Sequence, residues 1–140
     1  MADMLKCEIV TPVQTVFESD ATYVALPGEM GGFGVMRRHE PLVAALAPGT
    51  VTVTVPGSSK DGGKASFVVS GGYAQISDDK VIVLANDALE VSSIKADDVR
   101  AELAKIDQTL AGLKADDPSV AYYKGQKAWF ELQLHTVTGE

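Results

Sequence analysis

The period of the apolar residues changes near Val91, and this change limits the possible folds more than any other feature of the sequence. Before it, apolar and polar side chains alternate, which is the pattern of strands with one buried face. In Thr50–Val55, for example, the valines occupy one face and the threonines the other. After it, apolar residues recur every three or four positions, as in an amphipathic helix. The sequence therefore predicts a β-rich body followed by helices.

Turn residues divide the β-rich part into about ten short strands. The expected strands are Leu5–Ile9, Gln14–Phe17, Ala21–Leu26, Phe33–Met36, Leu42–Leu46, Thr50–Val55, Lys64–Val69, Tyr73–Ile76, Lys80–Leu84 and Leu89–Val91. Because no helical pattern interrupts them, we expect a β-sandwich or flattened barrel of antiparallel strands. The segment Pro56–Lys64 is rich in Gly, Ser and Lys, which is typical of an exposed hairpin tip.

The first expected helix follows Val91. Ser92 and Ser93 are good helix caps, and Asp97 and Asp98 suit the first turn, where negative charge meets the positive end of the helix dipole. The apolar stripe of this helix consists of Val99, Leu103, Ile106, Leu110 and Leu113. A proline preceded by two aspartates then ends the helix.

A second helix is expected to begin near Ser119. One of its faces, flanked by Tyr122, Trp129 and Phe130, carries Ala121, Gly125, Ala128 and Leu132. Two helices of roughly 20 residues with a short connection form an antiparallel α-helical hairpin. Such a pair has little core of its own and needs a packing partner. We therefore expect two domains, a β-sandwich over residues 1–91 and a C-terminal hairpin over residues 92–140.

Composition excludes several classes of protein. The 140 residues are 46% apolar, enough to bury a core, and a net charge of −7 disfavours nucleic acid and anionic membranes as partners. Cys7 is the only cysteine, so we expect no internal disulfide and a small buried side chain. The chain lacks a signal-peptide pattern and an apolar run of the roughly 20 residues that span a bilayer. We expect a soluble protein of a reducing compartment that meets the membrane only through a partner.

Residues that carry catalysis are scarce. The chain has two histidines, His39 and His135, and none of the common nucleophile, phosphate-loop or zinc-protease motifs. The pairs Asp78-Asp79 and Asp116-Asp117 are interpreted as solvated turn acids. His39, taken alone, is interpreted as a loop histidine that hydrogen-bonds the backbone. Residues far apart in the sequence could still form a nucleophile–base pair in the fold, and this alternative stays open. The sequence favours a non-catalytic protein.

Five fragments follow one another along the first two-thirds of the chain. They are Glu8–Pro12, Pro27–Val35 with His39–Val43, Leu46–Gly49, Val69–Ala74 and Val81–Ala85. Together with the helical hairpin they resemble the epsilon subunit of F-type ATP synthases, which is called delta in mitochondria. The second fragment is the most characteristic, since the family commonly has Pro-Gly-x-x-Gly-x-x-Gly-Ile-Leu-Pro-Gly-His-Ala-Pro-Leu there. The resemblance covers almost the whole chain.

This resemblance implies a non-catalytic rotor subunit that couples proton transport to ATP synthesis. The sandwich would bind the gamma subunit and the polar loops of the c-ring. The helices would either fold on the sandwich or extend along gamma towards the alpha and beta subunits, and the extended state would inhibit ATP hydrolysis. The chain would then lie on the cytoplasmic face of the bacterial inner or plasma membrane as part of the ATP synthase complex.

The resemblance also assigns roles to individual residues of the sandwich. His39 matches the loop histidine that faces the c-ring in the family, and Arg37-Arg38 replace the usual Pro-Gly before it. Two arginines can pair with acidic or carbonyl groups of the ring loops, or stay solvated. Several relatives have an acidic residue where this chain has Gly32, so a second polar contact with the ring is not implied.

Some family members bind ATP on the folded hairpin through an Ile-Asp-x-x-Arg-Ala motif. This chain keeps Asp97 and Arg100 but lacks the isoleucine, so the resemblance implies at most a weak regulatory ATP site and no required cofactor. Lys124 or Lys127 would bind the phosphates there. Without ATP, Asp97 and Arg100 form a solvated ion pair one helical turn apart. The lysines expected to contact acidic segments of the beta subunit are Lys105, Lys114, Lys124 and Lys127.

Two other functions remain as alternatives. In a nucleotide sensor, ATP held by Asp97 and Arg100 would stabilise the folded hairpin, and equilibrium binding of ATP to the isolated protein would test this. A small β-barrel enzyme is the second alternative, which the scarcity of catalytic pairs disfavours.

Overall fold

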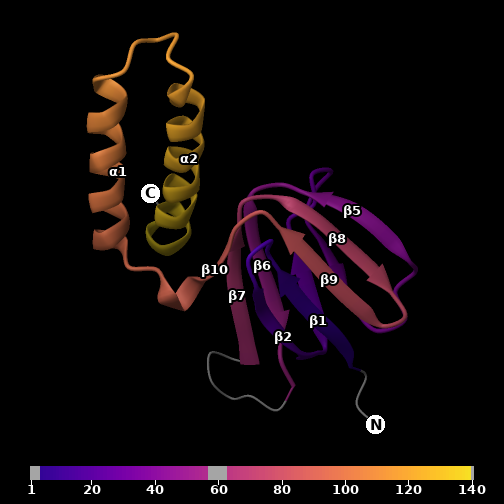
Figure 1. Ribbon diagram of the computed structural model, residues 1–140. Helices are drawn as coiled ribbons and strands as arrows, with labels where there is room; N and C mark the ends of the chain where they lie inside the picture. Colours follow the sequence, from indigo (N-terminus) through magenta and orange to yellow (C-terminus); the bar gives the residue numbers. More distant parts are fainter. Residues whose placement is uncertain (1–3, 57–62, 140) are drawn as a thin grey trace. The chain divides into compact units, whose positions relative to one another are not determined.

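The computed structural model describes residues 4–56 and 63–139 (Figure 1). The chain divides into two compact units, Met1–Glu90 and Val91–Glu140. Within the described residues, the strands belong to the first unit and the α-helices to the second. Most of the expected hairpin tip at Pro56–Lys64 lies outside the described residues.

The first unit is a β-sandwich, which confirms the predicted fold class. Its two five-stranded sheets have the orders β2-β1-β9-β8-β5 and β10-β7-β6-β3-β4. The strands are β1 (Leu5–Val10), β2 (Thr15–Ala21), β3 (Tyr23–Leu26), β4 (Phe33–Val35), β5 (Leu42–Leu46), β6 (Gly49–Thr54), β7 (Lys64–Val69), β8 (Gly72–Ser77), β9 (Lys80–Ala85) and β10 (Ala88–Glu90). They coincide with the expected runs, and the largest difference is β2, which continues to Ala21 rather than ending at Phe17.

Alternation within the strands builds the core between the two sheets. Val51 and Val53 of β6 are fully buried, while the threonines of this strand are partly exposed. Phe67 of β7 is the largest fully buried side chain, and its ring centroid lies 4.8 Å from that of Phe17. Cys7 is buried as expected, and burial raises the pKa of its thiol to about 12. A thiol of that pKa stays protonated at neutral pH and is a poor nucleophile.

One strand pair departs from the predicted antiparallel arrangement. β1 and β9 are parallel neighbours, with Cys7 beside Val81 and Ile9 beside Val83. The prediction is wrong here because alternation records which face of a strand is buried, and not the direction of its neighbour. A parallel pair requires a long connection. In this fold the connection between β1 and β9 includes strands of both sheets.

The second unit is a helical hairpin, also as predicted. It consists of the 3-10 turn η2 (Val91–Ser93), α1 (Ala96–Ala111) and α2 (Ser119–Thr138). In Figure 1 the two α-helices run side by side, with their connection at the top of the view. Asp97 and Asp98 lie in the first turn of α1 as expected. α2 begins at the expected Ser119, whose N–H donates to Asp117 Oδ1 at 2.8 Å.

The prediction that Ser92 and Ser93 cap the first helix is wrong. Both residues belong to η2, in which the Ile94 N–H donates to the Val91 carbonyl. The chain is extended again at Lys95, which takes the N-cap position without a side-chain hydrogen bond. The N-cap position of α1 is therefore held by Lys95 and by neither serine.

The interior of the hairpin is small. Of the predicted stripe on α1, Val99 and Ile106 are buried and the three leucines are partly exposed. On α2 the small residues of the predicted face are exposed, and Leu132 is half-buried. Gln133 is 3% exposed, and its Nε2 has no hydrogen-bond partner. A buried amide group without a partner destabilises the folded state by about 1–3 kcal/mol.

Candidate functional site

Part of the outer face of sheet β2-β1-β9-β8-β5 is apolar and exposed. Val10 lies beside Leu84, Leu84 beside Tyr73, and Tyr73 beside Ala45. On the same side of the sheet, Val43 is 68% exposed and Tyr73 is 58% exposed. We call these five residues the apolar face. Contiguous apolar groups on a protein surface commonly mark an interaction site.

The apolar face is hollowed at one end. A pocket of about 580 Å³ is lined by Val10, Ala45, Tyr73 and Leu84, together with polar residues that include Asn86. A pocket that offers both apolar and polar groups can receive a side chain of a partner and orient it.

The neighbouring part of this outer face is charged. Lys80 Nζ lies 3.3 Å from Glu8 Oε1, across the parallel β1–β9 pair. Hydrogen bonds with Glu18 and with Lys80 lower the pKa of the Glu8 carboxyl. The outer face of one sheet therefore divides into an apolar and a charged region.

The candidate partner-binding residues of the sandwich lie in a tight turn between β4 and β5, which we call the 36–39 turn. The His39 N–H donates to the Met36 carbonyl at 3.2 Å, so Arg37 and Arg38 are its central residues. Arg38 has a φ of 68° and is the only one of the two with positive φ. This is the pattern of a type II turn, whose second central position favours glycine. A pocket of about 410 Å³ is lined by Thr22, Met36, Arg37 and Arg38.

The ring of His39 is oriented by the backbone. Nδ1 lies 2.7 Å from the Glu40 carbonyl oxygen. A carbonyl can only accept, so Nδ1 carries a proton and donates it, and Nε2 of the neutral ring is left as an acceptor. The predicted hydrogen bond between this loop histidine and the backbone is therefore confirmed. Its contact with a c-ring stays a prediction.

Asp79, in the turn between β8 and β9, contacts both arginines of the 36–39 turn. Its Oδ1 accepts the backbone N–H of Arg38 at 2.6 Å, and its Oδ2 lies 3.7 Å from Arg37 Nε. Its backbone carbonyl accepts the N–H of Lys6 at 3.0 Å. The interpretation of Asp79 as a solvated turn acid was therefore incomplete. The residue is exposed and lies in a turn, but its carboxylate binds a second turn.

The candidate nucleotide-binding pair on α1 is an ion pair at the helix surface. Arg100 Nη1 lies 3.3 Å from Asp97 Oδ1, and the two side chains are 46% and 97% exposed. Lys127 Nζ lies 2.9 Å from Asp107 Oδ1 of α1, and this hydrogen bond raises the pKa of Lys127. Asp107 is about two turns, or roughly 10 Å, from Arg100 along the helix. The structure brings Asp97 and Arg100 together, but it does not bring Lys127 to them.

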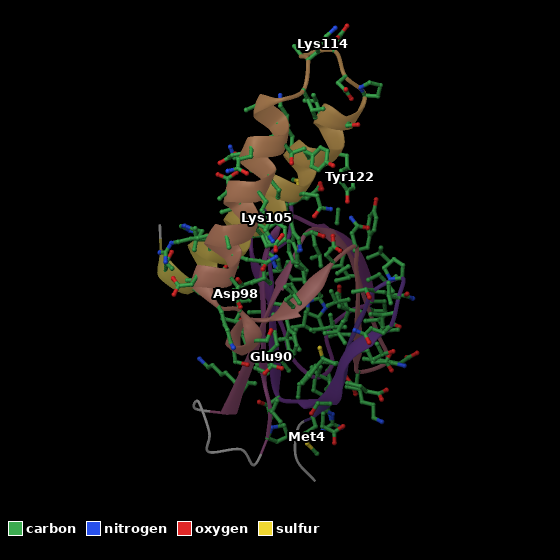
Figure 2. The ribbon with its side chains drawn as sticks, turned by 60° about the vertical axis from the view of Figure 1, so that its left-hand side comes forward. Met4, Glu90, Asp98, Lys105, Lys114 and Tyr122 are labelled. Atoms are coloured by element: carbon green, nitrogen blue, oxygen red, sulfur yellow. The ribbon has the colours of Figure 1, made fainter. Side chains whose placement is uncertain are left out.

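The other candidate lysines lie along the hairpin and form no single cluster. Lys105 Nζ lies 3.5 Å from Glu102 Oε1 on α1, and Lys114 lies in the connection between the helices (Figure 2). Lys124 is exposed on α2. Exposed ion pairs of this kind contribute little to stability, so a partner can compete for these lysines at small cost.

The whole chain has relatives of similar length. Residues 4–91 match the family model described as ATP synthase, Delta/Epsilon chain, beta-sandwich domain. The ATP synthase epsilon chain of Rhodospirillum rubrum is 35% identical over 112 residues, which are 79% of each chain. That of Neisseria meningitidis serogroup C is 34% identical over 128 residues, covering 91% of this chain and 82% of the relative. The epsilon chain of Myxococcus xanthus is 32% identical over 136 residues, covering 97% and 89%.

This chain belongs to the ATP synthase delta/epsilon chain family. The resemblance carried by the five sequence fragments is thereby confirmed. Family membership makes the chain a subunit of an ATP synthase and not a free-standing enzyme. ATP synthesis and ion transport are the activities of the complex to which such chains belong.

Solved structures share the fold of this delta/epsilon chain. A chain of the Euglena gracilis mitochondrial ATP synthase, solved as OSCP/F1/c-ring in rotational state 1, has a TM-score of 0.69 at 20% identity. The match covers 100% of this chain and 84% of that one. A chain of the Tetrahymena thermophila mitochondrial ATP synthase central stalk/c-ring has a TM-score of 0.59 at 18% identity, covering 95% and 96%. At such identities the likeness concerns the fold alone.

Two further observations concern metals and membranes. Among the residues that the structure describes, no group of three or more His, Cys, Asp or Glu side chains is placed to hold a metal ion. Over the same residues, each helix is too short or too polar to cross a bilayer.

Sequence reasoning missed the apolar face and the role of Asp79. A signal for the face was present, because β9 reads Val-Ile-Val-Leu-Ala without polar alternation, which is typical of a strand covered on both sides. No local signal joins Asp79 to Arg38, since their contact links two turns 41 residues apart.

Proposed function

We propose that this delta/epsilon chain is a rotor subunit in the central stalk of an F-type ATP synthase, where it couples proton transport to ATP synthesis. Its sandwich joins the gamma subunit to the polar loops of the c-ring, and its hairpin regulates ATP hydrolysis. The chain is held at the cytoplasmic face of the bacterial inner or plasma membrane through the complex. The names of the two fold relatives, from an F1/c-ring and a central stalk/c-ring assembly, support these partners.

The observation that carries this proposal is a pair of unlike surfaces at opposite ends of the β8–β9 hairpin. The pocket of the apolar face lies where β8 begins and β9 ends, at Tyr73 and Leu84. The 36–39 turn is bound where β8 ends, at Asp79. About four residues of strand, or roughly 13 Å, separate the two ends.

Each surface suits a different partner. An apolar interface is typical of a permanent contact, so we assign the apolar face to gamma. The two arginines and His39 of the 36–39 turn offer donors to acidic and carbonyl groups, so we assign this turn to the polar ring loops. A body with two such ends can connect one partner to the other.

The hairpin is suited to a regulatory role because little is buried within it. An element with few buried apolar contacts opens at low free-energy cost, and a partner can shift its population. In the extended state we expect its lysines to face acidic segments of the beta subunit. These are Lys105, Lys114, Lys124 and Lys127.

Removing the residues after Glu90 tests this division of roles. The shortened chain should still co-purify with gamma and the c-ring from the source cell, while the ATPase activity of the membranes should rise. Both chains are expressed in a strain of the source cell whose own copy of this gene has been deleted, and the full-length chain is the control. Loss of assembly would contradict the separate roles of the two units, and unchanged ATPase activity would contradict regulation by the hairpin.

ATP as a weak regulatory ligand stays a prediction. The candidate residues are Asp97 and Arg100, which already pair with one another on α1. Titration of the isolated chain with ATP by calorimetry tests this site, with Arg100→Ala as the disabled variant and Lys105→Ala as the matched control on the same helix. A dissociation constant far above the cellular ATP concentration would remove the nucleotide sensor as a function.

A further inference from the structure

We propose that Asp79 is the positioning residue of the 36–39 turn. Its carboxylate holds Arg38 in the left-handed backbone conformation that presents His39 to the c-ring. The identity of the partner rests on the function proposed above. The anchoring of the turn can be tested without any partner.

The turn needs an anchor because arginine occupies its second central position. Arg38 has a φ of 68°, where the Cβ of an L-residue is crowded by the backbone. Relative to glycine, this crowding shifts the equilibrium against the turn on the order of tenfold. The turn itself is closed by one hydrogen bond, from the His39 N–H to the Met36 carbonyl at 3.2 Å. A further contact is needed to favour this conformation.

Asp79 makes that contact at both central residues. The 2.6 Å distance from Arg38 N to Asp79 Oδ1 is short, as expected for a hydrogen bond to a charged acceptor. In a turn of this type the N–H of the second central residue has no partner within the turn, so the carboxylate accepts from a donor that would otherwise face water. Arg37 Nε lies 3.7 Å from the other carboxylate oxygen.

Asp79 is itself fixed to the sheet. Asp78 and Asp79 have φ values of 51° and 57°, as in the two-residue type I′ turns that join antiparallel strands. Ser77 and Lys80 pair at the base of this turn. The Lys6 N–H at the start of β1 donates to the Asp79 carbonyl at 3.0 Å. Through Asp79, the 36–39 turn is held in a defined place relative to β1, β8 and β9.

Asp79→Ala and Asp78→Ala form a matched pair of variants. Both put alanine at a positive φ in the same turn, so both carry a similar backbone strain, but only Asp79→Ala removes the carboxylate that binds Arg38. In the isolated full-length chain, we expect Asp79→Ala to speed hydrogen exchange of the Arg38 amide about tenfold and to shift the His39 ring resonances. Asp78→Ala should change neither. Equal effects of the two variants, at matched global stability, would overturn the anchor.

Arg38→Gly supplies the second test, since glycine adopts this conformation without strain. The probe is the rotor of the source enzyme, stripped of its own delta/epsilon chain. Asp79→Ala should weaken binding of the full-length chain to it about tenfold in the native background and less than about twofold in the Arg38→Gly background. Arg38→Gly removes both the strain and the arginine side chain, so Arg38→Ala, which removes the side chain but keeps a Cβ at positive φ, is the matched background and should keep the tenfold loss. Equal losses in both backgrounds would contradict the proposal.

The two tests also separate this inference from the proposed function. If the native chain does not bind the rotor, the proposed function fails, and the exchange rate of the Arg38 amide still decides whether Asp79 is the anchor. If the native chain binds the rotor and Asp79→Ala changes neither exchange nor affinity, the proposed function stands and Asp79 is not a positioning residue.

Discussion

The sandwich and the hairpin differ in how much of each is buried. In the sandwich the inward side of almost every strand contributes to one apolar core, which includes Val53 and Phe67. In the described part of the hairpin the buried side chains are Val99, Ile106 and Gln133, and the last of these is polar. The sandwich therefore has a core large enough to specify its own structure. The hairpin is held by few contacts, so its state depends more on whatever packs against it.

A core substitution in the sandwich should have the largest effect. Phe67→Ala removes the largest fully buried side chain and should lower the free energy of unfolding by about 3–5 kcal/mol. Urea unfolding, followed by circular dichroism, measures this change. Val43→Ala, at an exposed position of the apolar face, is the control and should stay within about 0.5 kcal/mol. A small effect of Phe67→Ala would mean that the sandwich core is not tightly packed.

The corresponding substitution in the hairpin should act locally. Ile106→Ala should destabilise the hairpin by about 2 kcal/mol and lower the helical signal at 222 nm, while amide protection in β6 and β7 stays unchanged. Gln108→Ala, an exposed position on the same helix, is the matched control. Equal loss of protection in the strands would show that the two units unfold together and that the hairpin has no separate, lower stability.

Gln133→Leu should move the hairpin in the opposite direction. The substitution removes a buried amide whose Nε2 has no partner and keeps a side chain of similar volume, so the hairpin should gain about 1 kcal/mol. Slower hydrogen exchange of the α2 amides measures this gain. Gln108→Leu controls for added apolar surface at an exposed position. Destabilisation by Gln133→Leu would indicate that the amide group contributes a favourable contact.

The smallest expected effect is a pH dependence at the Lys127–Asp107 contact. The hydrogen bond to Asp107 raises the pKa of Lys127 in the folded chain. Its contribution to stability is therefore fully present below the ordinary lysine pKa of about 10.4 and is lost as pH rises through the raised pKa. Circular dichroism of the helices between about pH 9 and 12 should show a steeper loss in the native chain than in Lys127→Gln. Lys124→Gln should behave like the native chain, and identical curves for both variants would exclude this contribution.

The fold could be predicted from local patterns to a large extent. Alternation located the strands, and the change of period at Val91 located the hairpin, because both depend on neighbouring residues. The parallel pairing of β1 with β9 could not be predicted, since the direction of a distant neighbour leaves no mark on local alternation. The predicted capping role of Ser92 and Ser93 was also wrong, because both residues lie in a 3-10 turn that precedes α1.

The candidate site was predictable only where it is local. The backbone hydrogen bond of His39 and the ion pair of Asp97 with Arg100 involve residues close in sequence, and both were expected. The contact of Lys127 with Asp107 depends on how α2 is rotated against α1, which the composition of either helix does not determine. Asp79 was missed because turn acids are usually solvated, and its partner lies in another turn.

The parallel β1–β9 pair has a consequence for the order of events during synthesis. β1 and β2 leave the ribosome first and can pair at once, but the other neighbour of β1 follows only after β3–β8. Pairing over such a sequence separation is slow, and until then the free edge of β1 is open to other chains. The Lys6–Asp79 hydrogen bond forms at the same junction. A nascent or truncated sandwich without β9 therefore lacks the anchor of the 36–39 turn. The rotor would bind the turn in its Asp79-anchored conformation only after β9 has joined the sheet.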